Sequence, residues 1–294
     1  MDLLTTAEAA DYLRLGERKL YELVAAEAIP CSKVTGKWLF PRHELDRWVL
    51  SGLVRPEGML PPDTPPIVGG SQDDLLEWAL RRSESGLASL NEGSENGLNR
   101  LVRGEVCAAA IHFHSSHEEE GEPPNVEIVR AMPLLHDVVL VAFARREQGL
   151  LLAPGNPRQL FSLADVVARN AKMAARQKGA GAQQLLEALL AKAGIGLSQL
   201  NLTPPCMSGP DLAAVIRAGT ADCGIATRSA ARAYGLDFVP LVWESFDLLM
   251  RQRTYFQPPM QTLLRFMAEN DLAARAEELS GYDVAPAGAI RFAK

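Results

Sequence analysis

Apolar positions near the N-terminus recur at the spacing of helices, and polar turns separate them. One helical stripe starts after Thr5, and a second starts at about Glu17. Thr5 is followed three residues later by Glu8, which is typical of a capping box, and Pro41 precedes a third amphipathic run. Between the second and third stripes, residues 32–40 alternate around a glycine, as in a two-stranded hairpin. This order of elements predicts a compact helix-turn-helix unit with a hairpin wing, a shape that docks on DNA.

Basic and aromatic side chains on this unit are the candidates for DNA contact. They are Arg18, Lys19 and Tyr21 on the second helix, and Lys33 and Lys37 beside the hairpin turn. Cations near a helix N-terminus are placed for base edges or phosphates. The alternative is that they form an ordinary solvated helix face.

Charge limits how such a unit can bind. Residues 1–55 contain eight Lys or Arg and eight Asp or Glu, and the whole chain has a formal net charge of -6. Because neutralisation of phosphates dominates non-specific affinity, a neutral unit does not coat DNA. We expect binding to one operator site in double-stranded DNA, weak for a monomer and dependent on a homodimer or higher homo-oligomer.

The order of motifs in this segment resembles the excisionase/MerR-like winged helix-turn-helix family. The matching stretches are Leu4–Leu13, Lys19–Leu23, Ile29–Pro30, Gly36–Trp38, Phe40 and Leu45–Trp48. The resemblance implies that the second helix enters the major groove and that the wing touches the backbone or the minor groove. Two positions differ from the family: Arg14 stands where Gly is usual, and Gly16 stands where a Ser cap is usual.

Length and composition place this unit in a larger protein. The chain has 294 residues, enough for a small and a larger domain. It contains no run near the ~20 apolar residues of a membrane helix and does not begin with a signal-peptide pattern, so we expect a cytoplasmic location without membrane association. The four cysteines are scattered without a CxxC pair, which favours reduced thiols over a structural zinc site.

Residues 55–66 are dense in proline and predict a semi-rigid linker. The predicted domains are therefore 1–54, the winged helix-turn-helix, and 67–294, the larger domain. In the larger domain short apolar strands alternate with helical patterns, which predicts an α/β fold with parallel or mixed sheets covered by helices. A second α/β set inserted into the first predicts two lobes, about 67–142 with 240–294 and about 143–239. A cleft between such lobes binds small ligands.

Three glycine-rich loops precede helices in this domain and are suited to an anion. They are Gly69–Asp73, Gly93–Gly97 and Arg176–Gly181. Backbone N–H groups at a helix N-terminus attract negative charge, and the third loop adds a guanidinium. Each loop alone is more simply an ordinary helix cap. Three in one domain indicate a ligand site.

The larger domain also resembles the molybdate-binding-like periplasmic-binding-protein family, which is often fused to this helix-turn-helix. The matching stretches are Asn96–Leu98, Leu101–Glu105, Ile111–His112, Arg146–Leu150, Ala153–Pro157, Arg176–Gly181, Gly219–Ile225, Gly235–Leu241 and Gly281–Asp283.

This second resemblance implies an oxyanion of the molybdate or tungstate type, or a related metal-cofactor species, closed between two lobes. The implied ligand contacts are Ser71, Gln72, Ser94, Arg176, Gln177, Gly179 and Gly181, with Asp222 near the cleft and Tyr282 in the returning segment. Two family donors are missing, because Ala182 stands where Thr or Ser is usual and Ser208–Gly209 where a Thr-His pair is common. No further cofactor is expected.

A histidine-rich segment offers a competing metal hypothesis. His112 and His114 would share one face of a strand and could chelate an ion, with His117 nearby. No Cys or paired carboxylate is adjacent in the sequence, so we favour a site without metal. Histidine titration near neutral pH is an equally open possibility.

Three classes of function are compatible with these patterns. The first is a ligand-responsive transcriptional regulator, the second is a ligand or cofactor carrier or enzyme-associated protein of molybdenum metabolism, and the third is an architectural DNA protein. No nucleophile elbow, paired carboxylates or metal signature indicates catalysis, so we expect no enzyme activity and no catalytic residues. The neutral N-terminal segment and the cleft-type domain disfavour the third class. The regulator is the favoured interpretation.

Overall fold

The computed structural model describes residues 2–34, 36–52, 64–114 and 123–294, and it contains two compact units, Met1–Met59 and Leu60–Lys294. Most of the proline-rich linker predicted at 55–66, and His117 of the histidine segment, lie outside the described residues. Within those ranges, no helix is both long and apolar enough to cross a membrane.

The first unit is a helix-turn-helix with a small added sheet. Its helices are α1 (Thr6–Tyr12), α2 (Glu17–Ala25) and α3 (Arg42–Ser51), and β1 (Leu3–Leu4) pairs antiparallel with β2 (Phe40–Pro41). The predicted capping box is present: Thr5 N donates to Glu8 Oε2 at 2.8 Å, and Glu8 N donates to Thr5 Oγ1 at 3.4 Å. The predicted hairpin is reduced to one bridge between Ser32 and Leu39.

The turn between α1 and α2 contains a left-handed residue. Arg14 has a φ of 55°, in the region that a glycine occupies without strain. Gly16 caps α2 without a side-chain hydrogen bond. The helix pair still packs on a shared core, which is composed of Ala9, Ala10, Leu20, Val24, Ile29, Phe40 and Leu45.

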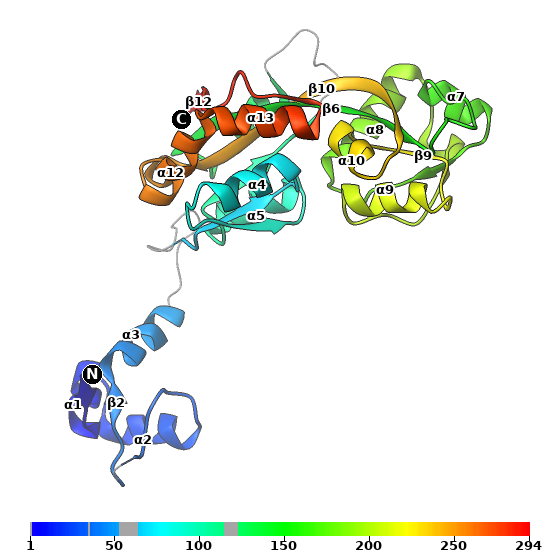
Figure 1. The fold of residues 1–294 in the computed structure, drawn as a ribbon. Coiled ribbons are helices and arrows are strands. Elements are labelled where there is room, and N and C mark those ends of the chain that lie inside the picture. The colour runs from blue at the N-terminus through cyan, green and yellow to red at the C-terminus, as the bar shows by residue number, and fades with distance from the viewer. Residues whose placement is uncertain (1, 35, 53–63, 115–122) are drawn as a thin grey trace. The chain divides into compact units, whose positions relative to one another are not determined.

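The second unit is built on one mixed sheet with the strand order β4-β3-β5-β10-β6-β9-β7-β8, of which Figure 1 labels β6, β9 and β10. Its strands are β3 (Ile67–Gly70), β4 (Ala88–Asn91), β5 (Ala108–Ile111), β6 (Val138–Leu152), β7 (Lys172–Ala174), β8 (Asn201–Leu202), β9 (Cys223–Thr227) and β10 (Asp237–Arg251), and β11 (Tyr282–Asp283) and β12 (Ile290–Ala293) also pair with β6. The two 15-residue strands β6 and β10 run antiparallel through both halves of the sheet. They therefore form the hinge between two lobes.

Each lobe has helices on both faces of its part of the sheet. In lobe 1, α4 (Asp74–Arg82), α12 (Pro258–Met267) and α13 (Asn270–Leu279) pack on one face, and α5 (Ser94–Arg103) and α6 (Pro124–Ala131) pack on the other. In lobe 2, α7 (Leu163–Ala168) and α8 (Gly181–Ala193) cover one face, and α9 (Gly209–Arg217) and α10 (Arg228–Ala233) cover the other. The short helices η1 (Leu197–Gln199) and α11 (Gln252–Tyr255) lie in connections.

The predicted α/β fold class is confirmed. Strands β3, β4 and β5 are parallel, as are β7, β8 and β9, and the antiparallel β6 and β10 make the sheet mixed. Helix α8 begins at Gly181, the last residue of the glycine-rich loop 176–181 that was expected to precede a helix, and ends at Ala193. Gly194 ends it in the left-handed conformation, at a φ of 67°. The four cysteines are free, and Cys107, Cys206 and Cys223 are buried.

Candidate ligand-binding cleft

A small cavity lies between the two lobes of the second unit. Its volume is about 90 Å³, far below the ~300–1,000 Å³ of pockets for drug-sized molecules, so it suits a ligand of a few non-hydrogen atoms. The lining residues from lobe 1 include Ser71, Gln72, Asp73, Asp74, Asn91, Gly93 and His112, and those from lobe 2 include Arg176, Gln177, Ala180, Gly181, Ser208 and Thr227. Arg146, Gln148 and Tyr282 complete the polar lining.

Helix N-termini converge on this cavity. Asp73 caps α4, Gly93 caps α5, Ala180 caps α8 and Ser208 caps α9, and all four capping residues line the cavity. Asp73 and Ser208 satisfy their own helices with side-chain hydrogen bonds, whereas the caps of α5 and α8 have none. The first backbone N–H groups of α5 and α8 are therefore left to bind an anion.

Arg176 supplies a cation to the same cavity. Its Nε donates to Gln177 Oε1 and to the Cys206 carbonyl, both at 3.2 Å, and its Nη2 donates to the Met207 carbonyl at 3.3 Å. These acceptors are neutral, and no carboxylate of the described chain lies within salt-bridge distance of Arg176. Burial lowers the pKa of Arg176, with Cys206 opposing that shift, but a guanidinium stays protonated. Asp211 also opposes the shift from outside salt-bridge distance, so the guanidinium has no direct ion pair among the described residues.

The sequence-predicted ligand residues are only partly brought together. Ser71, Gln72, Arg176, Gln177 and Gly181 line the cavity. Tyr282 lines it as well. Ser94 is fully buried behind Ser71, with 2.8 Å between the two Oγ atoms, and Gly179 also lies outside the lining.

The glycines of the 176–181 loop allow close contact between the lobes. A Cβ on Gly181 would lie 2.1 Å from Cε1 of His112 in lobe 1, and a Cβ on Gly179 would lie 2.7 Å from Glu95 Oε2. Gly179 also has a φ of 83°, which a side chain rarely adopts. At Gly181 the opposite lobe occupies the space of a side chain, whereas at Gly179 the backbone conformation is the stronger restriction, because Glu95 Oε2 is the end of an exposed side chain that can move.

Asp222 does not lie at the cleft, and the expectation that it contacts a ligand there is wrong. Its Oδ2 accepts from Lys172 N at 2.8 Å, and its Oδ1 accepts from Arg158 Nε at 3.2 Å. Asp222 precedes the first residue of β9, whereas Thr227, the last residue, lines the cavity. Ligands of such sheets bind beyond the carboxyl ends of the strands, and Asp222 is at the amino end.

A buried charge network in the wall of the cavity was not predicted from the sequence. Arg146, on the hinge strand β6, donates through Nη1 to Asp73 Oδ2 at 3.0 Å and through Nε to Glu244 Oε1. Tyr282 Oη donates to Asp73 Oδ2 at 2.9 Å. Burial alone would lower the pKa of Arg146, but Glu244 and Asp73 outweigh it and raise the pKa. The sequence does contain a sign of this network. Charged residues, Arg146 among them, stand in the middle of the apolar stretch 138–152, and buried charges require partners.

Glu244 also joins the histidine segment, although it lies 130 residues from His114 in the sequence. Its Oε2 accepts from His112 Nδ1 at 3.1 Å and from His114 Nε2 at 2.7 Å, and Gln148 Nε2 donates to Oε1 at 2.9 Å. Burial would raise the pKa of Glu244, but Arg146 and His112 hold it well below its ordinary value. Burial lowers the pKa of His112 to about 4.

His112, His114 and Glu244 are the described residues that could hold a metal ion, since one donor atom from each lies within 4.8 Å of the others. In this geometry, however, both oxygens of Glu244 already accept hydrogen bonds, one of them from the Arg146 guanidinium. These hydrogen bonds satisfy Glu244 and fix His112 beside the cavity, whereas Gln148 Oε1 is buried without a hydrogen-bond partner among the described residues.

The predicted DNA contacts lie on the exposed surface of the first unit. Arg18 on α2 has a side chain that is 95% exposed and lies 3.4 Å from Glu22, which also pairs with Lys19. Tyr21 is exposed, and so are Lys33 and Lys37, with the Lys33 ammonium over the Trp38 ring. Because these pairs are solvated, they hold the cations weakly and leave them available to phosphates.

The fold and the cleft define a class of two-lobed binding domain preceded by a helix-turn-helix. Residues 77–268, more than half of the chain, match the PBP superfamily domain, and the chain belongs to this family. Residues 3–52 match a helix-turn-helix domain. This combination is the architecture of a DNA-binding regulator or binding protein.

Individual relatives are distant. The uncharacterised protein YvgK of Bacillus subtilis is 22% identical, and the match covers 97% of this chain and 96% of that protein. Among solved structures, an H2O2-bound Cys-to-Ser mutant of Corynebacterium glutamicum OxyR is similar with a TM-score of 0.53 and 14% identity, over 93% of this chain and 90% of that one. A second OxyR mutant gives a TM-score of 0.51 at 14% identity, over 93% and 91%. At this identity the likeness is one of fold.

Proposed function

We propose that this protein is a cytoplasmic transcriptional regulator in which a small anion, bound between the lobes, changes the affinity of the helix-turn-helix for operator DNA. The observation that carries the proposal is Arg176, a guanidinium without a carboxylate partner, in a cavity that also receives the uncapped N-termini of α5 and α8. Regulation requires that the ligand bind one arrangement of the protein better than the other.

The DNA-binding half is proposed to act as an excisionase/MerR-type winged helix-turn-helix. Helix α2 would enter the major groove with Arg18, Lys19 and Tyr21, and Lys33 and Lys37 would contact the backbone. Equal numbers of acidic and basic residues in this segment support a role for a homodimer, in which two weak modules bind one operator together.

The ligand is proposed to be a small oxyanion or a related cofactor. Sequence resemblance makes molybdate and tungstate the first compounds to test. Ala182 has no hydroxyl, and the Ser208 hydroxyl accepts from Asp211 N at 3.1 Å to cap its own helix. Ser208 keeps its hydroxyl proton as a donor, so Arg176, Ser208 and backbone N–H groups would provide the donors that a buried dianion needs on nearly every oxygen.

The first experiment measures thermal stability of the full-length protein with molybdate, tungstate, sulfate, phosphate and a pterin cofactor. DNA binding is then measured with and without each stabilising compound, on sequences that the protein selects from a random pool. We expect one compound to raise the melting temperature and to change DNA affinity. A stabilising compound that leaves DNA affinity unchanged would instead identify a ligand carrier of molybdenum metabolism without direct regulation.

Substitution of Arg176 tests the assignment of the site. Arg176→Ala is expected to abolish the stabilisation by ligand while leaving folding and basal DNA binding intact. Arg158→Ala is the matched control, because Arg158 lies in the same lobe, is half exposed and pairs with Asp222 outside the cavity. Normal ligand binding by Arg176→Ala would show that the anion binds elsewhere.

A further inference from the structure

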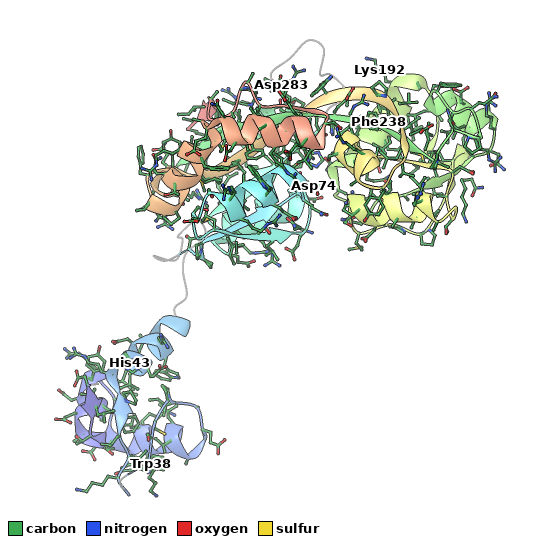
Figure 2. The ribbon with its side chains drawn as sticks, in the orientation of Figure 1. Trp38, His43, Asp74, Lys192, Phe238 and Asp283 are labelled. Carbon is green, nitrogen blue, oxygen red and sulfur yellow. The ribbon has the colours of Figure 1, made fainter. Side chains whose placement is uncertain are left out.

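Asp74 places a second charge in the ligand cavity. It is the first residue of α4 and lines the cavity at the end of lobe 1 nearest to lobe 2 (Figure 2). Its neighbour Asp73 is neutralised by Arg146, but no Lys or Arg within the described ranges lies within salt-bridge distance of Asp74. Ser229 is placed to hydrogen-bond to it, which does not neutralise the charge. A carboxylate is therefore exposed to whatever binds beside Arg176.

Ser71 adds an acceptor on the same side. The Ser94 hydroxyl donates to the His112 carbonyl at 3.1 Å and accepts from His112 N at 3.0 Å. Ser94 has one hydroxyl proton, and either hydroxyl can donate in the 2.8 Å contact between Ser71 and Ser94; when the Ser94 proton points to the His112 carbonyl, that contact uses the Ser71 proton. Ser71 then presents lone pairs, and no hydroxyl hydrogen, to the cavity.

Asn91 gives a third acceptor. Its Nδ2 donates to Glu77 Oε1 at 2.7 Å. Among the described residues, no hydrogen-bond donor is bonded to its side-chain oxygen, which can accept from a ligand. The cavity thus has two chemical sides. Arg176 and the N-termini of α5 and α8 supply donors, whereas Asp74, Ser71 and Asn91 supply acceptors.

We propose that the ligand carries a hydrogen-bond donor, N–H or O–H, in addition to its negative charge, and that Asp74 selects for that donor. This inference rests on the proposed anion site and narrows its ligand class. A fully deprotonated oxyanion would place its lone pairs against Asp74 and Ser71. This repulsion lowers its binding affinity, and no contact offsets it. An anion with a proton, or a small zwitterion, satisfies both sides.

The protonation of Asp74 agrees with this assignment. Burial raises its pKa, and the charges of Asp73 and Glu77 act in the same direction. A carboxyl group with a raised pKa is suited to share a proton with a bound ligand, as paired oxygens do in other sites. Acidification should therefore improve binding of anions that have no proton of their own.

The test is isothermal titration of the full-length protein with two matched pairs of anions at neutral pH. Sulfate and phosphate have the same shape, but only phosphate carries a proton; acetate and glycine differ in that only glycine carries an ammonium group. In at least one pair, the donor-bearing member is expected to bind about tenfold more tightly than its partner. A preference confined to phosphate identifies a protonated oxyanion, and one confined to glycine identifies a zwitterion.

Asp74→Asn supplies the deciding variant, because its amide can donate where the carboxylate only accepts. It is expected to lose the preference and to bind sulfate or molybdate about tenfold more tightly than the unmodified protein does. Asp271→Asn is the control, at the exposed first turn of α13 and outside this cavity, and should change nothing.

Two results would overturn the inference in distinguishable ways. In the first, molybdate or sulfate binds as tightly as phosphate or glycine does, and this affinity is unchanged in Asp74→Asn but lost in Arg176→Ala. That result would keep the anion site and exclude selection by Asp74. Absence of binding by any of these anions to the unmodified protein would remove the anion site and, with it, both proposals.

Discussion

Gly181 and His112 meet across the ligand cleft, so closely that a Cβ on Gly181 would lie 2.1 Å from Cε1 of the imidazole ring. The ring cannot easily yield, because Glu244 accepts from His112 Nδ1 at 3.1 Å and the side chain is buried. The two lobes can therefore reach this separation only if residue 181 has no side chain. The glycine-rich loop at 176–181 controls closure of the cleft as well as access to backbone N–H groups.

Gly181→Ala should weaken ligand binding without unfolding the protein. The added methyl group would hold the lobes apart at His112, and ligand affinity should fall by about tenfold or more, while each lobe keeps its own core. Affinity is measured by titration and folding by circular dichroism. Gly196→Ala is the control, because Gly196 is exposed and the nearest heavy atom to its added Cβ lies 3.5 Å away. Unchanged affinity in Gly181→Ala would mean that ligand binds to a more open arrangement.

Arg146→Met should destabilise the second unit strongly, by about 3–5 kcal/mol, because it leaves two buried carboxylates without their cation. Arg146 is almost fully buried between Asp73 and Glu244. The adjacent Arg145 provides a matched comparison, since its side chain is 48% exposed and its nearest carboxylate, that of Asp283, is 3.8 Å away. Arg145→Ala should change stability by less than about 0.5 kcal/mol. Urea unfolding followed by fluorescence gives both values, and equal effects would show that the buried network contributes little.

Patterns among residues close together in the sequence were sufficient to predict the helices and part of the ligand site. Thr5 and Glu8 marked the start of α1, and the glycine-rich loop 176–181 marked the start of α8. Arg176 and Gln177 could be found because a cation beside a glycine-rich helix start is visible within six residues. Such features depend on neighbours along the chain.

The remainder of the site depends on strand pairing, which the sequence does not display. Arg146 and Glu244 are 98 residues apart and meet because β6 and β10 pair in one specific register. Asp222 was misplaced for a related reason, since its distance from the cleft depends on which end of β9 faces the ligand. The pairing of Leu3 and Leu4 with Phe40 and Pro41 involves strands too short to show alternation.

The protonation of His112 should make stability depend on pH. Its pKa is about 4 in the folded protein, lowered by burial, against an ordinary value of 6.5. Between these values the unfolded chain binds more protons than the folded protein, so the free energy of unfolding decreases as the pH falls from 6.5 and this contribution is exhausted near 4. The loss is on the order of 3 kcal/mol.

His112→Gln tests this pH dependence, because Gln has no titratable group and can still donate to Glu244. Urea unfolding between pH 7 and pH 4.5 should show a shallower decrease for the variant than for the unmodified protein. His136→Gln, a change at an exposed histidine of the same unit, should keep the full decrease. Parallel curves for all three proteins would mean that His112 titrates normally in the folded state.

Arg18→Ala should weaken operator binding without changing stability. The Arg18 side chain is 95% exposed. Among the described residues it pairs with Glu22 at 3.4 Å, one helical turn away. A solvated pair of this kind contributes about 0.3–0.5 kcal/mol to stability. If Arg18 contacts a phosphate, the slope of log affinity against log salt should fall by about 1, uniformly across sequences; if it reads a base, specificity at one position should relax instead, at a cost of about 1–3 kcal/mol. Arg47→Ala is the control, because Arg47 forms a similar exposed pair with Glu44, at 3.1 Å, but lies on α3. Equal losses in both variants, or none in either, would exclude α2 as the recognition helix.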